Sequence, residues 1–288
     1  MGVSFLSFLG MIITLLVSVL VPIGAAVIFG VTNKGKGVWK AWLLGAAGFI
    51  LLQVLIRIPV LNILSMFHFF QKFTVKHYVI YCLLLAFSAA LFEVIARFGV
   101  AKILQKKMNF QQGVAAGLGH GGIEAIILIG ATYISNIILA IMINMGVMQN
   151  ILHSLMTSGA DMLTIQQYKG IIYTLSNTPS CDFYLAGYER ILAMILHVAM
   201  SLLVCYFVYK KKAVIGVGIA FVIHFLVDFI APLINGMTTY AMGKILSQGA
   251  AYGIIYTFLT FMGIVSIAII VVIGILWKRE KKNEAKEL

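Results

Sequence analysis

Seven long apolar runs constrain this chain more than any other feature of its sequence. They cover residues 4–30, 38–60, 78–101, 112–145, 184–209, 213–235 and 250–277. A helix needs about 20 mainly apolar residues to cross the hydrocarbon core of a bilayer, and each run is at least that long. The runs are near-continuous and do not alternate apolar with polar residues, which excludes a transmembrane β-barrel. We therefore predict an all-α, polytopic membrane bundle of about seven transmembrane helices.

Composition supports a membrane protein and argues against a nucleic-acid partner. The 288 residues are 62% hydrophobic and 10% charged, with a mean hydropathy of +1.05. Soluble domains are typically about half apolar and a quarter charged. The net charge of +12 comes from basic residues at the ends of the apolar runs, where they would set topology. No repeat or low-complexity segment divides the chain, so we expect a single integral membrane domain over residues 1–288, surrounded by a lipid bilayer.

The basic residues near and beyond the ends of the runs predict an orientation. Fourteen of them fall on one side: Lys34, Lys36, Lys40, Lys102, Lys106, Lys107, Lys210, Lys211, Lys212, Lys278, Arg279, Lys281, Lys282 and Lys286. Only five fall on the other side: Arg57, Lys72, Lys76, Lys169 and Lys244. Positive residues favour the cytoplasmic side of a membrane. This distribution predicts an N-terminus outside and a cytoplasmic C-terminus, and the short basic loops suit a bacterial cell membrane.

A small set of ionisable residues remains inside the apolar runs, within residues 78–235. Its members are Glu93, Arg97, His120, Glu124, Glu189, Arg190, His197, His224 and Asp228. Three pairs in this set are four residues apart, a spacing that places both side chains on one helix face. A charged side chain at the bilayer centre costs at least about 2.5–3.5 kcal/mol, so such groups face the bundle interior and pair with one another. The set therefore predicts a functional polar centre.

The residue types suggest hydrolysis of an amide. His120, His197 and His224 come from three helices and can meet at one depth, where three imidazoles can bind zinc and leave a fourth position for water. A glutamate would then act as general base, and Arg97 could steady an oxyanion. Without a metal, Glu93 could activate water directly. The predicted roles are catalytic for Glu93, Arg97 and Glu124, metal-binding for His120, His197 and His224, and supporting for Asp228, Glu189 and Arg190.

Four glycines surround the first of these histidines, in the stretch "GLGHGG". They are Gly117, Gly119, Gly121 and Gly122. Small residues allow helices, or a substrate backbone, to approach closely. The fourth apolar run is also longer than one span requires, which favours a kink or a partly unwound turn near His120.

These motifs resemble those of the CAAX-protease and bacteriocin-immunity superfamily, which includes prenyl-protein endopeptidases and PrsW-like proteases. The element "GHGGIEA" and the layout of the whole chain are most similar to the YhfC family of intramembrane metallopeptidases. The resemblance covers roughly residues 80–235. It implies a helical membrane core and cleavage of a membrane-embedded or lipid-anchored polypeptide.

The resemblance also implies roles by position. Glu93 matches the glutamate of the first motif and Arg97 its basic partner, while His197, His224 and Asp228 match later motif residues. Many relatives carry a Glu-Glu pair in the first motif, whereas here Phe92 precedes Glu93. This departure leaves two alternatives open: either Glu93 is the base, or Glu93 pairs with Arg97 and Glu124 is the base.

The first functional hypothesis is therefore an intramembrane endopeptidase that uses Glu-activated water, with or without a His-bound metal. Buried Glu, His and Arg residues also form proton relays, so a proton-coupled transporter is an alternative. The chain shows no inverted repeat of the kind that transporters often contain. A further alternative is a non-catalytic immunity protein of the same fold, whose polar residues would affect stability alone.

Overall fold

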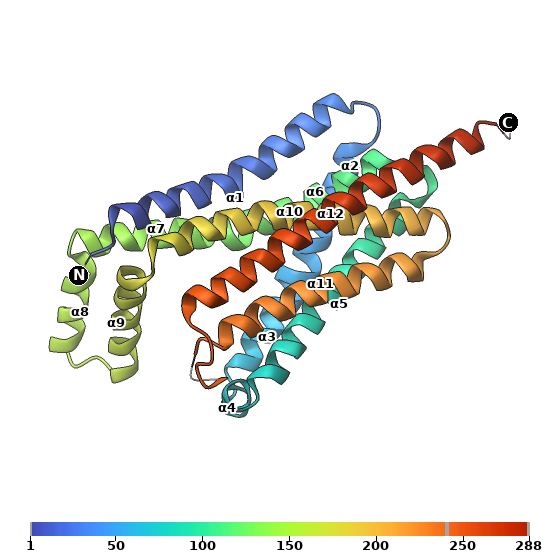
Figure 1. Cartoon of the computed structure of the whole chain (residues 1–288). Coiled ribbons are helices and arrows are strands. Elements are labelled where there is room, and N and C mark those ends of the chain that lie inside the picture. The colour runs from blue at the N-terminus through green and yellow to red at the C-terminus, as the bar shows by residue number, and fades with distance from the viewer. Residues whose placement is uncertain (1, 240–241, 287–288) are drawn as a thin grey trace. The chain divides into compact units, whose positions relative to one another are not determined.

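The computed structural model describes residues 2–239 and 242–286, which form helices joined by turns (Figure 1). In chain order the elements are α1 (Phe5–Thr32), α2 (Val38–Phe49), η1 (Ile50–Arg57), α3 (Ile58–Ser65), α4 (His68–Lys76), α5 (Tyr78–Leu104), η2 (Gln105–Lys107), α6 (Phe110–Glu124), η3 (Ala125–Gly130), α7 (Ala131–Asn144), α8 (Val147–Thr157), α9 (Met162–Asn177), α10 (Ser180–Tyr209), α11 (Ala213–Gly236) and α12 (Gln248–Glu284). The described residues contain no strand, which confirms the all-α prediction.

Among the residues that the structure describes, seven helical stretches are long and apolar enough to cross a membrane. They are Phe5–Thr32, Val38–Ser65, Tyr78–Leu104, Phe110–Asn144, Ser180–Tyr209, Ala213–Gly236 and Gln248–Glu284. Each coincides with one of the seven predicted runs. Many large apolar side chains on them are exposed, among them Ile28 of α1 and Val271 of α12. An apolar exterior of this kind suits hydrocarbon, and the chain is an integral membrane protein. Its predicted orientation stays a prediction.

Contacts within the chain divide it into two compact units, which we describe separately. The first combines the chain up to Ile23 with Ala125–Ile191, and the second combines Gly24–Glu124 with Leu192–Leu288. The single domain expected over the whole chain stays a prediction.

The first unit is built around an apolar cluster that joins the start of the chain to α7 and α8. Met11, Ile143 and Met148 are at most 2% exposed at its centre. Helices α8 and α9 lie side by side in this unit (Figure 1). Helix α9 begins where the Asp161 carboxylate accepts a hydrogen bond from the Thr164 backbone N–H at 2.9 Å, because this cap satisfies one of the free donors of the first turn.

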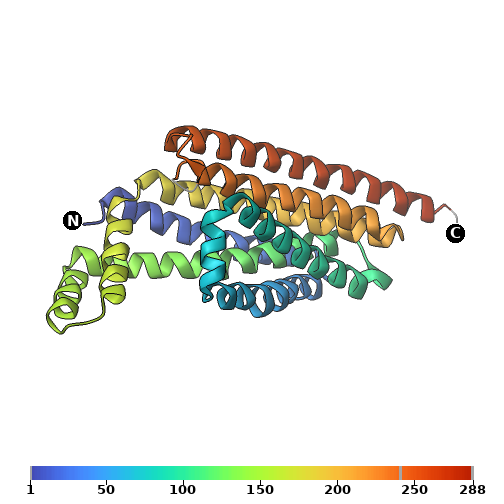
Figure 2. The same ribbon diagram turned by 90° about the horizontal axis from the view of Figure 1, so that it is seen from below.

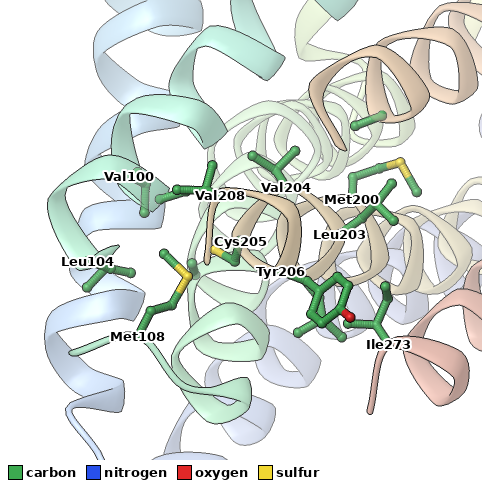
Figure 3. Packing of buried hydrophobic residues seen from close by; sticks show 14 of the residues in the cluster. Val100, Leu104, Met108, Met200, Leu203, Val204, Cys205, Tyr206, Val208 and Ile273 are labelled. Atoms are coloured by element: carbon green, nitrogen blue, oxygen red, sulfur yellow. The ribbon is translucent and has the colours of Figure 1, made fainter. Parts of the chain in front are cut away.

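The second unit has a larger apolar core around the C-terminal half of α10. Figure 3 shows Met200 and Val204 of α10 within this cluster, together with Val100 of α5 and Ile273 of α12. Met200 and Val204 are 0% exposed. Helix α11 packs along α5, and the two helices lie side by side in both Figure 1 and Figure 2.

The glycines of α2 and α6 allow these two helices to approach closely. A β-carbon at Gly45 would overlap the backbone carbonyl of Ala116, and one at Gly119 would overlap that of Trp42. Only glycine fits where backbones meet at such short range. The glycine-rich stretch around His120 therefore serves tight helix packing, one of the two functions that its composition suggested.

Two spans contain π-helical segments, which are wider than an α-helical turn. Segment η1 interrupts the second span, and η3 begins directly after Glu124 in the over-long fourth span, where a kink was expected. Arg57, which the charge count placed on the outer side and which was left out of the set of ionisable residues inside the runs, lies inside the second span at the end of η1. Leaving Arg57 out of that set was wrong, because the helical stretch continues past it to Ser65.

Candidate metal centre

Seven of the nine predicted site residues lie together in the second unit, on four helices. Glu93 and Arg97 come from α5, His120 and Glu124 from α6, His197 from α10, and His224 and Asp228 from α11. The three histidines, Glu93 and Arg97 are each at most 4% exposed. Their spacing within each helix brings the side chains onto the inward face, as predicted from the i, i+4 pairs.

The Glu93 carboxylate lies at the centre of this group. Its Oε2 atom lies 2.8 Å from Nη2 of Arg97, 3.2 Å from Nε2 of His224 and 3.4 Å from Nε2 of His120. Nδ1 of His197 is 3.8 Å away. An ionised carboxylate carries only acceptors, so a buried one needs donors beside it, and Arg97 supplies one of them. One carboxylate oxygen therefore connects α5 to the other three helices.

The His197 ring bridges Arg97 and Glu124. Nη2 of Arg97 lies 2.7 Å from Nδ1 of His197, and Nε2 of the same ring lies 2.9 Å from Oε2 of Glu124. A guanidinium can only donate, so Nδ1 accepts. In the neutral imidazole the proton then sits on Nε2, the nitrogen that faces Glu124. Arg97 thereby fixes the tautomer of His197 in this arrangement.

Four of these residues could hold a metal ion. Glu93, His120, Glu124 and His197 each offer one ligand atom, and these atoms all lie within 4.8 Å of one another. Two imidazoles with a carboxylate are a common set for a catalytic zinc ion. Nε2 of His120 is buried and makes no hydrogen bond with any described residue, which is the state of a nitrogen that can accept a metal. The donor set therefore fits a metal of this kind.

His224 lies beside the four-residue group. Its Nε2 atom is 3.2 Å from the Glu93 carboxylate and also 3.2 Å from Oδ2 of Asp228. Shared between two carboxylates, this nitrogen acts as a donor to both. The Asp228 side chain is 31% exposed, so it forms a more open edge of the cluster. The predicted metal-binding role of His224 and the supporting role of Asp228 stay predictions.

The remaining predicted residues, Glu189 and Arg190, belong to the first unit. Nη2 of Arg190 lies 2.6 Å from Oε1 of Glu189, and the Glu189 side chain is 40% exposed. This contact is an ion pair between sequence neighbours on α10. Their predicted supporting role stays a prediction.

Two residues of the site were missed by the sequence reasoning. Gln53 on η1 donates from Nε2 to Oε1 of Glu93 at 3.2 Å, and Nη1 of Arg57 donates to Oε1 of Gln53 at 3.3 Å. Gln53 is uncharged and is therefore not among the ionisable residues of the apolar runs. The signal was a glutamine and an arginine four residues apart in the apolar stretch "LLQVLIRIP".

Comparison with known proteins identifies the family. The sequence pattern of the YhfC intramembrane metalloprotease family matches residues 17–247, which include every residue of the cluster. The chain belongs to the YhfC family. It is 31% identical over 201 residues to the uncharacterized membrane protein YhfC of Bacillus subtilis (strain 168), covering 68% of this chain and 73% of that relative. No solved structure matches the chain. The four-helix cluster thus places a candidate metal site in a member of the YhfC family.

Proposed function

We propose that this protein is an intramembrane endopeptidase that hydrolyses a peptide bond of a membrane-embedded or lipid-anchored polypeptide. The observation that carries the proposal is the buried group of Glu93, His120, Glu124 and His197, with ligand atoms within 4.8 Å of one another. Burying this many ionisable groups in a membrane-spanning bundle is costly, and such sets mark functional sites. Membership of a family described as intramembrane metalloproteases supports the same function.

Zinc is the metal that this donor set suits best, held by His120, His197 and Glu93. Zinc, when bound, supplies a Lewis acid that lowers the pKa of water to about 7 and polarises a carbonyl group. Nε2 of His120 lies 3.4 Å from Oε2 of Glu93 but makes no hydrogen bond to a described residue, so it can bind a metal without losing one. To bind a metal through Nε2, His197 must first carry its proton on Nδ1, because Nε2 would otherwise hold it on the side of Glu124. Arg97 must then also lose its hydrogen bond to Nδ1.

Glu124 is the general base in this proposal. Glu93 is surrounded by donors and its side chain is 6% exposed, whereas the Glu124 side chain is 14% exposed. A base must reach the water whose proton it takes. Glu124 accepts that proton as the water oxygen bonds to the peptide carbon, and returns it to the leaving nitrogen as the C–N bond breaks. This assignment selects one of the two alternatives that the first motif left open.

Arg97 provides positive charge beside the reacting centre. It neutralises Glu93 through Nη2. Its Nε and Nη1 atoms are buried and make no hydrogen bond with the residues that the structure describes. Donors held in place before the reaction can stabilise an oxyanion as it develops. We assign this function to Arg97.

The test is the appearance of new protein termini in membranes. Wild type, Glu124→Gln and Glu284→Gln are expressed in cells that lack the endogenous protein, and membrane polypeptides are compared by quantitative mass spectrometry of their termini. Glu284 is a matched control because it is an exposed carboxylate on α12 that pairs with Lys281. We expect termini within or next to transmembrane segments with wild type and Glu284→Gln, and none with Glu124→Gln. Identical termini in all three would refute the proposal.

A further inference from the structure

The second span contributes a polar connection to the site that none of the sequence motifs contains. Gln53 of η1 is 3% exposed, and its amide Nε2 donates to Oε1 of Glu93 at 3.2 Å and to the backbone carbonyl of Ala89 at 3.3 Å. Glu93 presents its other oxygen, Oε2, to Arg97 and the histidines. Gln53 therefore binds the one carboxylate oxygen that faces away from the cluster of donors.

Arg57 determines which end of the Gln53 amide faces Glu93. Nη1 of Arg57 lies 3.3 Å from Oε1 of Gln53, and a guanidinium has no acceptor, so the oxygen end must face Arg57. The amide NH₂ is thereby directed at Glu93. Arg57 is itself held on α5, where its Nε donates to Oγ of Ser88 at 3.0 Å and its Nη2 donates to the carbonyl of Leu85 at 2.9 Å.

The local backbone suits this arrangement. Gln53 and Arg57 both lie in the π-helical segment η1, in the middle of a long span. Single π-helical turns are uncommon and frequently occur at functional sites. At the end of η1, Arg57 binds to α5, and four residues earlier Gln53 binds the Glu93 carboxylate. Both contacts are therefore made to α5, the helix that carries Glu93.

We propose that Gln53, oriented by Arg57, is a positioning residue that holds the Glu93 carboxylate with Oε2 toward the metal-binding side chains. This inference rests on the proposed function. Groups that orient metal ligands typically change metal affinity or activity by about 10–100-fold when they are removed. A merely structural hydrogen bond between two spans would instead affect stability alone.

The test measures zinc affinity, by competition with a chromophoric chelator, in detergent-purified full-length protein. Gln53→Met keeps the length of the side chain but removes the donor, and we expect zinc binding about 10–100-fold weaker than in wild type. The control is Gln112→Met. Gln112 is also a buried amide, but its partner is the Asn109 backbone N–H at the start of α6, so its loss should lower thermal stability and leave zinc affinity unchanged.

A double-mutant cycle separates positioning from general damage. Arg57→Met leaves Gln53 in place but frees its amide to rotate, so it should weaken zinc binding in the same direction. If Arg57 acts through Gln53, the double variant binds zinc no more weakly than Gln53→Met alone. If Gln53→Met fails to fold, the zinc affinities of Arg57→Met and Gln53→Asn test the same contact.

The outcomes distinguish this inference from the proposed function. Zinc binding by wild type with unchanged affinity in Gln53→Met and Arg57→Met would overturn the inference and leave the metal centre intact. Additive losses in the double variant would overturn the action of Arg57 through Gln53. No zinc binding by wild type would refute the metal centre itself, and the inference with it.

Discussion

The guanidinium of Arg97 lies 2.8 Å from the carboxylate of Glu93, and the two side chains are 1% and 6% exposed. Two opposite charges in this position compensate each other's loss of hydration. Removing one partner leaves the other charge buried and unpaired, which is far more costly than losing an ion pair at a surface.

Arg97→Ala should therefore destabilise the protein by about 3–5 kcal/mol, the usual cost of breaking a buried pair. Lys281→Ala is the matched control, because Lys281 pairs with Glu284 at 2.9 Å with its side chain 53% exposed. An exposed pair of this kind is worth at most about 1 kcal/mol. Unfolding in mixed detergent micelles compares the two. Equal losses would show that the Glu93–Arg97 pair is not desolvated.

The close approach of α6 to α10 predicts the effect of a single methyl group. A β-carbon at Gly121 would lie 2.7 Å from Cβ of His197, so Gly121→Ala must displace the histidine. Overpacking of this kind costs about 1–3 kcal/mol, and we expect metal binding to fall as well. At Gly99 of α5 an added β-carbon meets nothing within 4 Å. Gly99→Ala should therefore be neutral or slightly stabilising, and the same behaviour in Gly121→Ala would contradict the packing described.

The predicted orientation can be tested with a native cysteine. Cys181, at the start of α10, is exposed, whereas Cys82 and Cys205 are buried. With the N-terminus outside, Cys181 lies on the outer side of the membrane. A membrane-impermeant maleimide should then label intact cells that express wild type, and Cys181→Ser should abolish the labelling. Labelling only after the cells are opened would reverse the orientation.

The sequence was sufficient to predict most of the fold. All seven spans follow from length and hydropathy, because a bilayer imposes a minimum length on each helix. The pairs at i, i+4 also predicted that their side chains face the same way, since residues at that spacing share a helix face. Glu93 with Arg97 is the clearest example, as the structure pairs them directly.

Other parts of the site depend on tertiary packing and were beyond sequence reasoning. The π-helical segment η1 turns Gln53 toward Glu93, and no residue pattern in "LLQVLIRIP" signals a wide turn. Arg57 was left out of the ionisable residues inside the runs because charge near the end of an apolar run usually marks its boundary. The close contact of Arg97 with His197 joins residues 100 positions apart, so no local spacing could reveal it.

The assignment of the base makes a separate prediction. Glu124→Gln removes the proton acceptor but none of the proposed ligands, so it should keep its zinc and lose about 10²–10⁴-fold in cleavage rate. Glu93→Gln alters a proposed ligand and should bind zinc more weakly. The measurement is zinc content together with the rate at which new termini appear. The reverse pattern, with zinc lost in Glu124→Gln and kept in Glu93→Gln, would exchange the two roles.

Metal content decides whether the buried cluster is a metal centre. Wild type and a His120→Ala/His197→Ala/His224→Ala variant are purified in detergent, exposed to zinc, freed of loosely bound ions and analysed by mass spectrometry. A single site of this type predicts about one zinc ion per chain in wild type, and none in the variant. Well-folded wild type without bound metal, or the same metal content in both proteins, would show that the cluster is not a metal centre.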